Sequence, residues 1–126
     1  MLSLDGGGVR GLSSLYIMKQ LMETINFERP PKPCDYFDMI GGTSTGGLIA
    51  IMLGRLGMDV NECIKAYKAI SPKIFTKVHH RINFKGRVQG RFDHTAIEAG
   101  VKELLKRGGL EEDARLQHSG PHMCKT

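Results

Sequence analysis

The 126-residue sequence contains no tryptophan, and only 6% of its residues are aromatic. It has no apolar run of the roughly 20 residues that a membrane-spanning helix needs and no basic segment followed by a long apolar stretch after Met1, so neither a transmembrane segment nor a signal peptide is predicted. The three cysteines, Cys34, Cys63 and Cys124, are odd in number and too far apart for a metal-binding pattern. They favour a reducing compartment. We therefore expect a cytoplasmic or peripheral membrane protein.

The length of the chain allows at most one domain. An apolar content of 40% and a charged content of 25% are close to those of globular proteins, which argues against disorder throughout. Glycine, with 16 residues, is about twice as frequent as usual. Many of these glycines belong to two short motifs, and the prediction of function depends on these motifs.

The first motif is the pentapeptide Gly42-Thr43-Ser44-Thr45-Gly46, which has the form G-x-S-x-G. An apolar segment, Tyr36–Ile40, precedes it and is predicted to be a strand, and the apolar segment Leu48–Leu56 after it is predicted to be a helix. This context is typical of a nucleophile elbow, in which a sharp turn exposes the serine hydroxyl. Gly42 and Gly46 would remove side chains where strand and helix approach each other. The alternative is a glycine-rich turn without chemistry.

The second motif, Asp5–Gly11, lies between a predicted strand, Met1–Leu4, and a predicted helix, Leu12–Ile25. Its glycines also fit the dinucleotide-binding pattern G-x-G-x-x-G, and Glu28 follows at about the distance expected of the ribose-binding acid. However, Glu28 precedes a cluster of prolines rather than ending the second strand. A dinucleotide-binding loop is therefore the weaker of two interpretations of this motif.

The stronger interpretation of this motif is an oxyanion loop. Successive glycines let the backbone N–H groups of Gly6, Gly7 and Gly8 turn towards one point. Arg10 adds positive potential, and the helix after Gly11 adds its N-terminal dipole. Because parallel strands place their carboxyl ends at one edge of the sheet, the loop and Ser44 are expected to meet there.

The remaining sequence is predicted to be mainly helical. Asp59 and Glu62 form a capping-box pattern before a helix that starts at Val60, and Ser71-Pro72 is expected to begin a new segment. Asp93 is a candidate cap for a last helix, in which Ile97 to Leu105 supply an apolar face. Gly108-Gly109 is expected to stop that helix.

The net charge of +5 is concentrated in a basic stretch between residues 73 and 91, which contains no acidic residue. A solvated loop is one interpretation of this stretch. Contact with anionic lipid headgroups, worth about 1 kcal/mol per basic residue, is another. Phenylalanines alternate with the basic residues, but no nucleic-acid-binding module accompanies them, so no nucleic acid is expected. The basic residues are Lys73, Lys77, Arg81, Lys85, Arg87 and Arg91.

Together, Asp5-Gly6-Gly7-Gly8-Val9-Arg10-Gly11 and Gly42-Thr43-Ser44-Thr45-Gly46 make the chain resemble a patatin-like phospholipase domain. The resemblance is clear for residues 2–105 and weak in the tail, 106–126. It implies a three-layer α/β/α fold with a parallel sheet and hydrolysis of lipid acyl esters by a Ser–Asp dyad. It also implies that Ser44 is the nucleophile and that Gly6, Gly7, Gly8, Arg10 and Gly11 form the oxyanion and substrate-binding loop.

The chain departs from the family pattern in one respect. The family's aspartate lies in an Asp-Gly-Gly or Asp-Gly-Ala stretch far beyond the serine, and no such stretch follows Ser44 here. We therefore expect residues 1–126 to be the N-terminal part of a longer patatin-like domain. A histidine could serve as the base instead, and five follow the serine: His79, His80, His94, His118 and His122.

The sequence thus predicts a serine lipid acyl hydrolase that acts through Ser44 and needs neither cofactor nor metal. The competing hypothesis from another class is a catalytically dead module that binds a lipid surface. A dinucleotide-binding domain is the third and weakest alternative.

Overall fold

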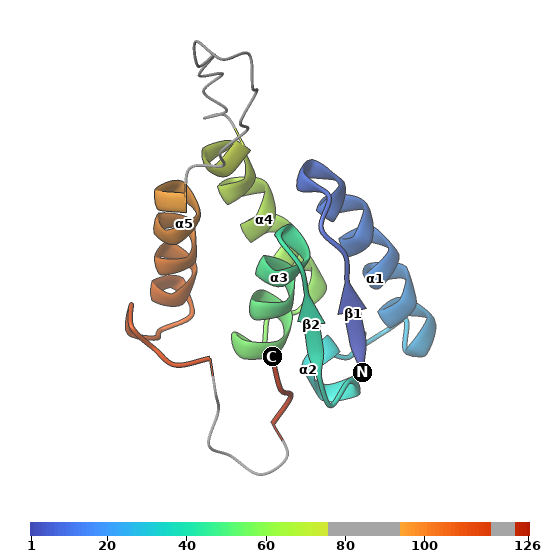
Figure 1. Ribbon diagram of the computed structural model, residues 1–126. Helices are drawn as coiled ribbons and strands as arrows, with labels where there is room; N and C mark the ends of the chain where they lie inside the picture. The colour runs from blue at the N-terminus through green and yellow to red at the C-terminus, as the bar shows by residue number, and fades with distance from the viewer. Residues whose placement is uncertain (76–93, 117–122) are drawn as a thin grey trace.

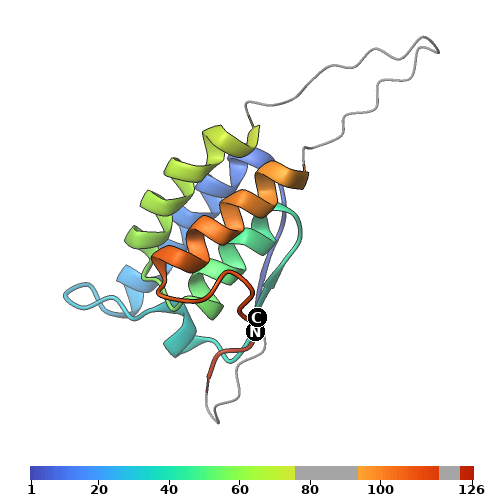
Figure 2. The same ribbon diagram turned by 90° about the vertical axis from the view of Figure 1, so that its left-hand side faces the viewer.

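The computed structural model describes residues 1–75, 94–116 and 123–126. Two short strands, β1 (Leu2–Leu4) and β2 (Ile40–Gly42), lie side by side in parallel (Figure 1). Leu4 and Ile40 are buried, whereas Ser3 is exposed, and the helices lie on one side of the strands (Figure 2). The predicted α/β class with a parallel sheet is confirmed. A helical layer on the other face of the sheet stays a prediction.

The second strand does not start where the sequence pattern placed it. The prediction of a strand over Tyr36–Ile40 is wrong, because residues 33–36 form the helical turn α2 (Pro33–Tyr36). Proline at the first helical position favours such a turn, and the N–H of Phe37 closes it on the carbonyl of Pro33 at 2.9 Å. The strand follows only at Ile40, where the backbone pairs with β1.

The glycine loop and the first helix follow β1 as predicted. A single 3₁₀ turn, η1 (Gly8–Arg10), leads into α1 (Gly11–Ile25). Leu15, Met18 and Met22 form the buried face of α1, which matches the predicted helical spacing. Helix α1 packs against α4, so the loop is anchored between the sheet and this helix pair.

The predicted helix after the serine is confirmed, but it starts three residues earlier than Leu48 and changes from α- to π-helical winding. Helix α3 (Thr45–Ala50) starts directly after Ser44 and continues as a π-helical stretch, η2 (Ile51–Arg55). The N–H of Leu56 donates to the carbonyl of Ile51, 2.9 Å away, which is the wider hydrogen bond of a π-helix. Helix α3 packs against both strands, so the apolar segment is buried as expected.

Helix α4 (Val60–Phe75) runs through the point at which the sequence predicted a break. The prediction that Ser71-Pro72 begins a new segment is wrong. Ile70 and Ile74, one helical turn apart, are both buried, and α4 packs against α5. Burial of this continuous apolar face outweighs the hydrogen bond that proline removes.

The start of α4 is closed by the predicted capping box. The side chain of Asp59 accepts a hydrogen bond of 2.8 Å from the N–H of Glu62. The side chain of Glu62 in turn accepts one of 3.0 Å from the N–H of Asp59. Each carboxylate therefore satisfies a backbone donor that the helix itself leaves unpaired.

We expect Asp59→Ala to lower the free energy of unfolding by about 1 kcal/mol, the usual cost of removing an N-cap. Urea denaturation of the 126-residue chain would measure it. Asn61→Ala is the matched control, because this exposed residue lies in the same first turn. Equal stability of the two variants would show that the box contributes nothing.

The last described helix, α5 (His94–Arg107), covers the predicted segment and ends at Gly108-Gly109 as predicted. Gly109 has a φ of 73° and lets the chain turn back, so that the N–H of Leu110 reaches the carbonyl of Leu105. The predicted cap, Asp93, lies outside the described residues.

The free edge of β2 receives a further backbone contact that the sequence did not indicate. Lys125 bridges Met39 in parallel, and its carbonyl accepts a hydrogen bond of 2.8 Å from the N–H of Ile40. Its own N–H donates to the carbonyl of Asp38 at 2.9 Å. The end of the described chain thus covers part of an edge that would otherwise be unpaired.

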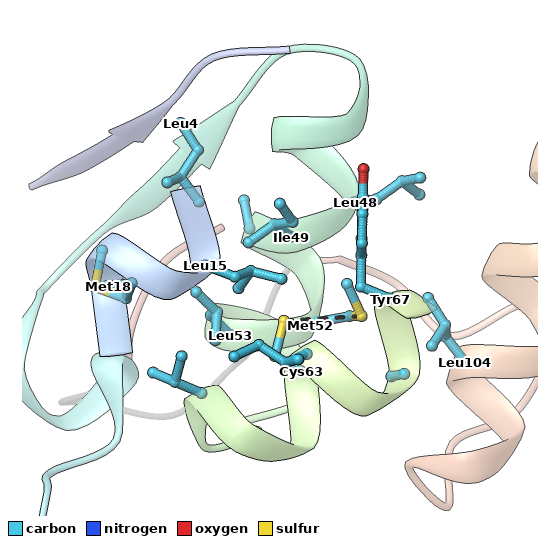
Figure 3. Close-up of a cluster of buried hydrophobic side chains, with 14 of the residues drawn as sticks. Leu4, Leu15, Met18, Leu48, Ile49, Met52, Leu53, Cys63, Tyr67 and Leu104 are labelled. Atoms are coloured by element: carbon cyan, nitrogen blue, oxygen red, sulfur yellow. Dashed lines mark hydrogen bonds between the residues drawn. The ribbon is translucent and has the colours of Figure 1, made fainter. Parts of the chain in front are cut away.

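The core lies between the sheet and α4 and is built from aliphatic and sulfur-containing side chains. Figure 3 shows Leu15 of α1, Ile49 of α3, Met52 of η2 and Cys63 of α4 in one cluster of buried side chains. Tyr67 belongs to the same cluster, and its hydroxyl lies at the edge of the cluster rather than inside it (Figure 3). This core fixes α3 and α4 beneath the loops that carry the site.

Candidate active site

Ser44 occupies the junction between β2 and α3 in an unusual backbone conformation. Its φ of 53° and ψ of −124° make it the one non-glycine residue with a positive φ in the described part of the chain. Such strain is worth about 1–3 kcal/mol and persists only where the surrounding structure enforces it. The side chain is exposed, as a nucleophile elbow requires.

Gly42 and Gly46 make this turn sterically possible. A Cβ atom on Gly42 would lie 2.6 Å from the carbonyl oxygen of Leu4 and would also overlap the backbone of Gly46. A Cβ atom on Gly46 would overlap the same Leu4 oxygen and lie 2.8 Å from the carbonyl oxygen of Asp5. The two elbow glycines therefore allow β2, α3 and the end of β1 to approach closely.

The glycine loop lies directly against the serine. A Cβ atom on Gly6 would be 2.8 Å from the Cβ and 3.5 Å from the hydroxyl oxygen of Ser44. Gly8 has a φ of 58°, a conformation that side chains disfavour. The two motifs, far apart in the sequence, thus meet at one corner of the sheet as predicted from parallel strand topology.

Hydrogen bonds from the loop to the elbow hold the two motifs together. The N–H of Gly6 donates to the hydroxyl oxygen of Thr43 at 3.3 Å, and that of Gly7 to the hydroxyl oxygen of Thr45 at 3.2 Å. Two of the three N–H groups expected to face an oxyanion therefore have threonine partners in this structure. Gly8 is the member of the trio for which no such bond to a threonine is found in the described residues.

Tyr67 of α4 supports the loop from below. Its hydroxyl donates a hydrogen bond of 2.6 Å to the carbonyl of Gly8, and only 2% of the residue is exposed. Burial raises the pKa of Tyr67, against the opposing effect of a hydrogen bond from the hydroxyl of Thr45. The phenol therefore remains a donor at neutral pH.

The last glycine of the loop has a different place from the others. A Cβ atom on Gly11 would lie 2.6 Å from the hydroxyl oxygen of Tyr67 and 3.2 Å from the side chain of Ile49. Gly11 is buried and makes room for the tyrosine. Arg10 is exposed, and its Cβ would be 3.3 Å from a side chain on Gly7, so it lies over the loop.

An open cavity of about 550 Å³ extends from the serine along the helices. Its walls are mainly aliphatic and come from α3, η2, α4, α5 and the segment after α5. The lining side chains include Ser44, Leu48, Ile51, Ile74, Val101 and Leu116. A mainly apolar cavity that reaches Ser44 suits a ligand with an apolar chain beside a polar group.

No described carboxylate or imidazole is hydrogen-bonded to the hydroxyl of Ser44. Asp59 caps α4, and Asp113 is exposed after α5. His79, His80, His118 and His122 lie outside the described residues, and only the backbone of His94 is described. The described part of the chain also contains no cluster of three or more His, Cys, Asp or Glu residues placed to hold a metal.

The basic stretch falls almost entirely outside the described residues. Only Lys73 is described, and its side chain is paired with Glu103 of α5 at 2.8 Å. Contact of an anionic lipid surface with Lys77, Arg81, Lys85, Arg87 and Arg91 stays a prediction. No helix in the described ranges has both the length and the apolarity to cross a membrane. Glu28 is exposed in the loop before β2, away from the end of that strand.

Sequence reasoning did not assign a role to Thr43, Thr45 or Tyr67. The two threonines are the variable positions of G-x-S-x-G, and the pattern gives no reason to single them out. Tyr67 lies on the buried face of α4, and helical spacing does not reveal that its hydroxyl meets Gly8. The one available signal is that tyrosine and threonine carry polar atoms that need partners when buried.

The structure is that of an α/β protein in which a serine at a strained strand–helix turn lies beside a glycine loop. The sequence profile of the family described as "Patatin-like phospholipase" matches residues 2–116. The chain belongs to the patatin-like phospholipase family. It is 36% identical to Patatin-07 and to Patatin-B1 of Solanum tuberosum over 109 residues, which is 83% of this chain.

These matches cover only part of each relative. The chain spans 28% of the length of Patatin-07 and Patatin-B1, and 24% of Patatin group M-1 from the same organism, to which it is 36% identical over 93 residues. No significant match to a solved structure was found.

Proposed function

We propose that this chain carries the nucleophile and the oxyanion loop of a serine lipid acyl hydrolase. The observation that carries the proposal is the strained conformation of Ser44, with a φ of 53°, at a point where Gly6 of the loop is almost in contact with it. A structure without a chemical role for this serine would gain nothing from the strain. Family membership supports the same conclusion.

In this mechanism the hydroxyl oxygen of Ser44 attacks the carbonyl carbon of an ester. A general base takes the hydroxyl proton, and the carbonyl oxygen becomes an oxyanion that backbone N–H groups stabilise. Collapse of the tetrahedral intermediate expels the alcohol, which receives the proton. Water then hydrolyses the acyl-enzyme by the same steps and releases the fatty acid.

The oxyanion donors are proposed to be the N–H of Gly8 and the N–H of Thr45. Thr45 opens α3, so its N–H has no acceptor within the helix. Gly6 and Gly7 would then contribute by fixing the loop against Thr43 and Thr45, and Arg10 by its positive charge. Gly11 would act by making room for Tyr67.

The apolar cavity beside Ser44 is proposed to take the acyl chain. Leu48, Ile51, Ile74 and Val101 line the cavity, and all four are aliphatic. An acyl chain that enters here places its ester carbonyl at the serine, while the headgroup remains towards solvent.

The general base is proposed to be an aspartate outside these 126 residues, in the Asp-Gly-Gly or Asp-Gly-Ala stretch that the family resemblance implies. Residues 1–126 would then be the N-terminal part of the domain, in line with the 28% of Patatin-07 that the chain spans. The competing hypothesis is a lipid-binding module without catalysis.

We expect the isolated 126-residue chain to react with a fluorophosphonate probe no faster than its Ser44→Ala variant. A serine hydroxyl without a base is a weak nucleophile, so labelling should stay at background. Mass spectrometry after timed exposure would measure the labelled fraction, and a thermal melt would show that the chain is folded. Rapid labelling at Ser44 would mean that a base is present within residues 1–126.

A further inference from the structure

We propose that Tyr67 and Thr45 are positioning residues that fix the glycine loop for the reaction at Ser44. This inference rests on the proposed function for its catalytic consequence. The geometry behind it is independent of that function and can be tested separately.

Two hydrogen bonds link the loop to the elbow and to α4. The N–H of Gly7 donates to the hydroxyl oxygen of Thr45, 3.2 Å away. The phenol of Tyr67 donates to the carbonyl of Gly8 at 2.6 Å. The two hydroxyls therefore hold consecutive residues of the loop from two different helices.

Both residues that hold the loop are themselves buried. Thr45 is 4% exposed and Tyr67 2%, whereas Gly6, Gly7 and Ser44 are exposed. Because packing fixes the two buried side chains, their hydrogen bonds can hold an exposed loop in one conformation. The glycines themselves supply no side-chain contacts that could do this.

The two hydrogen bonds flank the peptide group between Gly7 and Gly8 and so restrict its orientation. Its neighbours on both sides are held, the N–H of Gly7 by Thr45 and the carbonyl of Gly8 by Tyr67. The N–H of Gly8, the proposed oxyanion donor, belongs to this peptide. Loss of either hydroxyl should therefore let the donor move relative to Ser44.

The structural effect can be measured on the 126-residue chain by amide hydrogen exchange with ¹⁵N-glycine labelling. We expect Tyr67→Phe to speed exchange at Gly7 at least about tenfold, because the hydroxyl that holds the carbonyl of Gly8 is lost while the aromatic packing is retained. Thr45→Val should have the same effect, and Thr45→Ser, which keeps the hydroxyl, should restore slow exchange. Tyr16→Phe is the matched control, because Tyr16 lies on the outside of α1 with its hydroxyl bonded to Lys68.

The catalytic effect requires a chain that carries the complete domain. Tyr67→Phe should lower kcat for a short-chain ester by about 10- to 100-fold, with KM changed less than twofold, because the oxyanion forms only in the transition state. Substitution of a residue with a purely structural role would lower the melting temperature without lowering kcat at a nearly constant KM.

Unchanged exchange at Gly7 in both Tyr67→Phe and Thr45→Val would overturn the positioning role, whatever the activity. Faster exchange with an unchanged kcat would also overturn it, since the loop would then not need to be fixed. If the complete wild-type domain hydrolysed no ester, the proposed function would fall, and the exchange result would still decide whether Tyr67 fixes the loop.

Discussion

Ser44→Ala is expected to lower ester hydrolysis by about 10⁴-fold or more in a chain that carries the complete patatin-like domain. A methyl group cannot form the acyl-enzyme, so only uncatalysed and weakly assisted hydrolysis would remain. The fold should be unaffected, because the side chain is exposed and alanine meets the same backbone strain at a φ of 53°. Turnover of p-nitrophenyl esters and a circular dichroism melt measure the two effects.

Ser13→Ala is the control for this experiment, because Ser13 is an exposed serine on α1 outside both motifs. It should leave turnover and melting temperature unchanged. Near wild-type turnover of the Ser44→Ala variant would exclude a serine mechanism at this position, and the elbow would then be a structural turn.

Gly46→Ala is expected to be the most destabilising single change at the site. The added methyl group would overlap the carbonyl oxygen of Leu4 and lie 2.8 Å from that of Asp5, and both are backbone atoms that cannot rotate away. Overpacking of this kind costs about 3 kcal/mol, and more where the surroundings are rigid. Thermal or urea denaturation of the 126-residue chain should show a loss of this size, or failure to fold.

Gly41→Ala provides the comparison within the same segment. A Cβ atom on Gly41, in β2, would meet no described atom within 4 Å, and its φ is not positive. Its effect on the free energy of unfolding should stay within about 0.5 kcal/mol. Similar stability of the two variants would show that α3 can move away from β1 and that the close approach at Gly46 is not required.

The sequence predicted the two glycine-rich segments better than the elements around them. The sharp turn at Ser44 and the glycine loop after β1 are confirmed as backbone features, because glycine spacing reports local backbone needs that few other arrangements share. Their roles in catalysis stay predictions. The second strand was misplaced because Tyr36–Ile40 is apolar, and strand and helical turn cannot be told apart in so short an apolar run. Pairing with β1 selects residues 40–42 instead.

The break predicted at Ser71-Pro72 failed for a different reason. Local propensity ends a helix at proline. Here, however, Ile70 and Ile74 are buried and α4 packs against α5, which starts more than twenty residues after Pro72. Propensity could not include that contact. The capping box at Asp59, which depends only on neighbouring residues, was predicted correctly.

By itself the sequence determined which serine stands in an elbow and which glycines lie at the end of the first strand. It also determined that parallel strands would bring them to one edge. Only the tertiary structure decided that Thr43 and Thr45 hold two of the glycine N–H groups and that Tyr67 holds the carbonyl of Gly8. These bonds join residues 37 to 59 positions apart. Such pairs are set by the pairing of β1 with β2 and by the packing of α4 against α1 and η1, rather than by any local pattern.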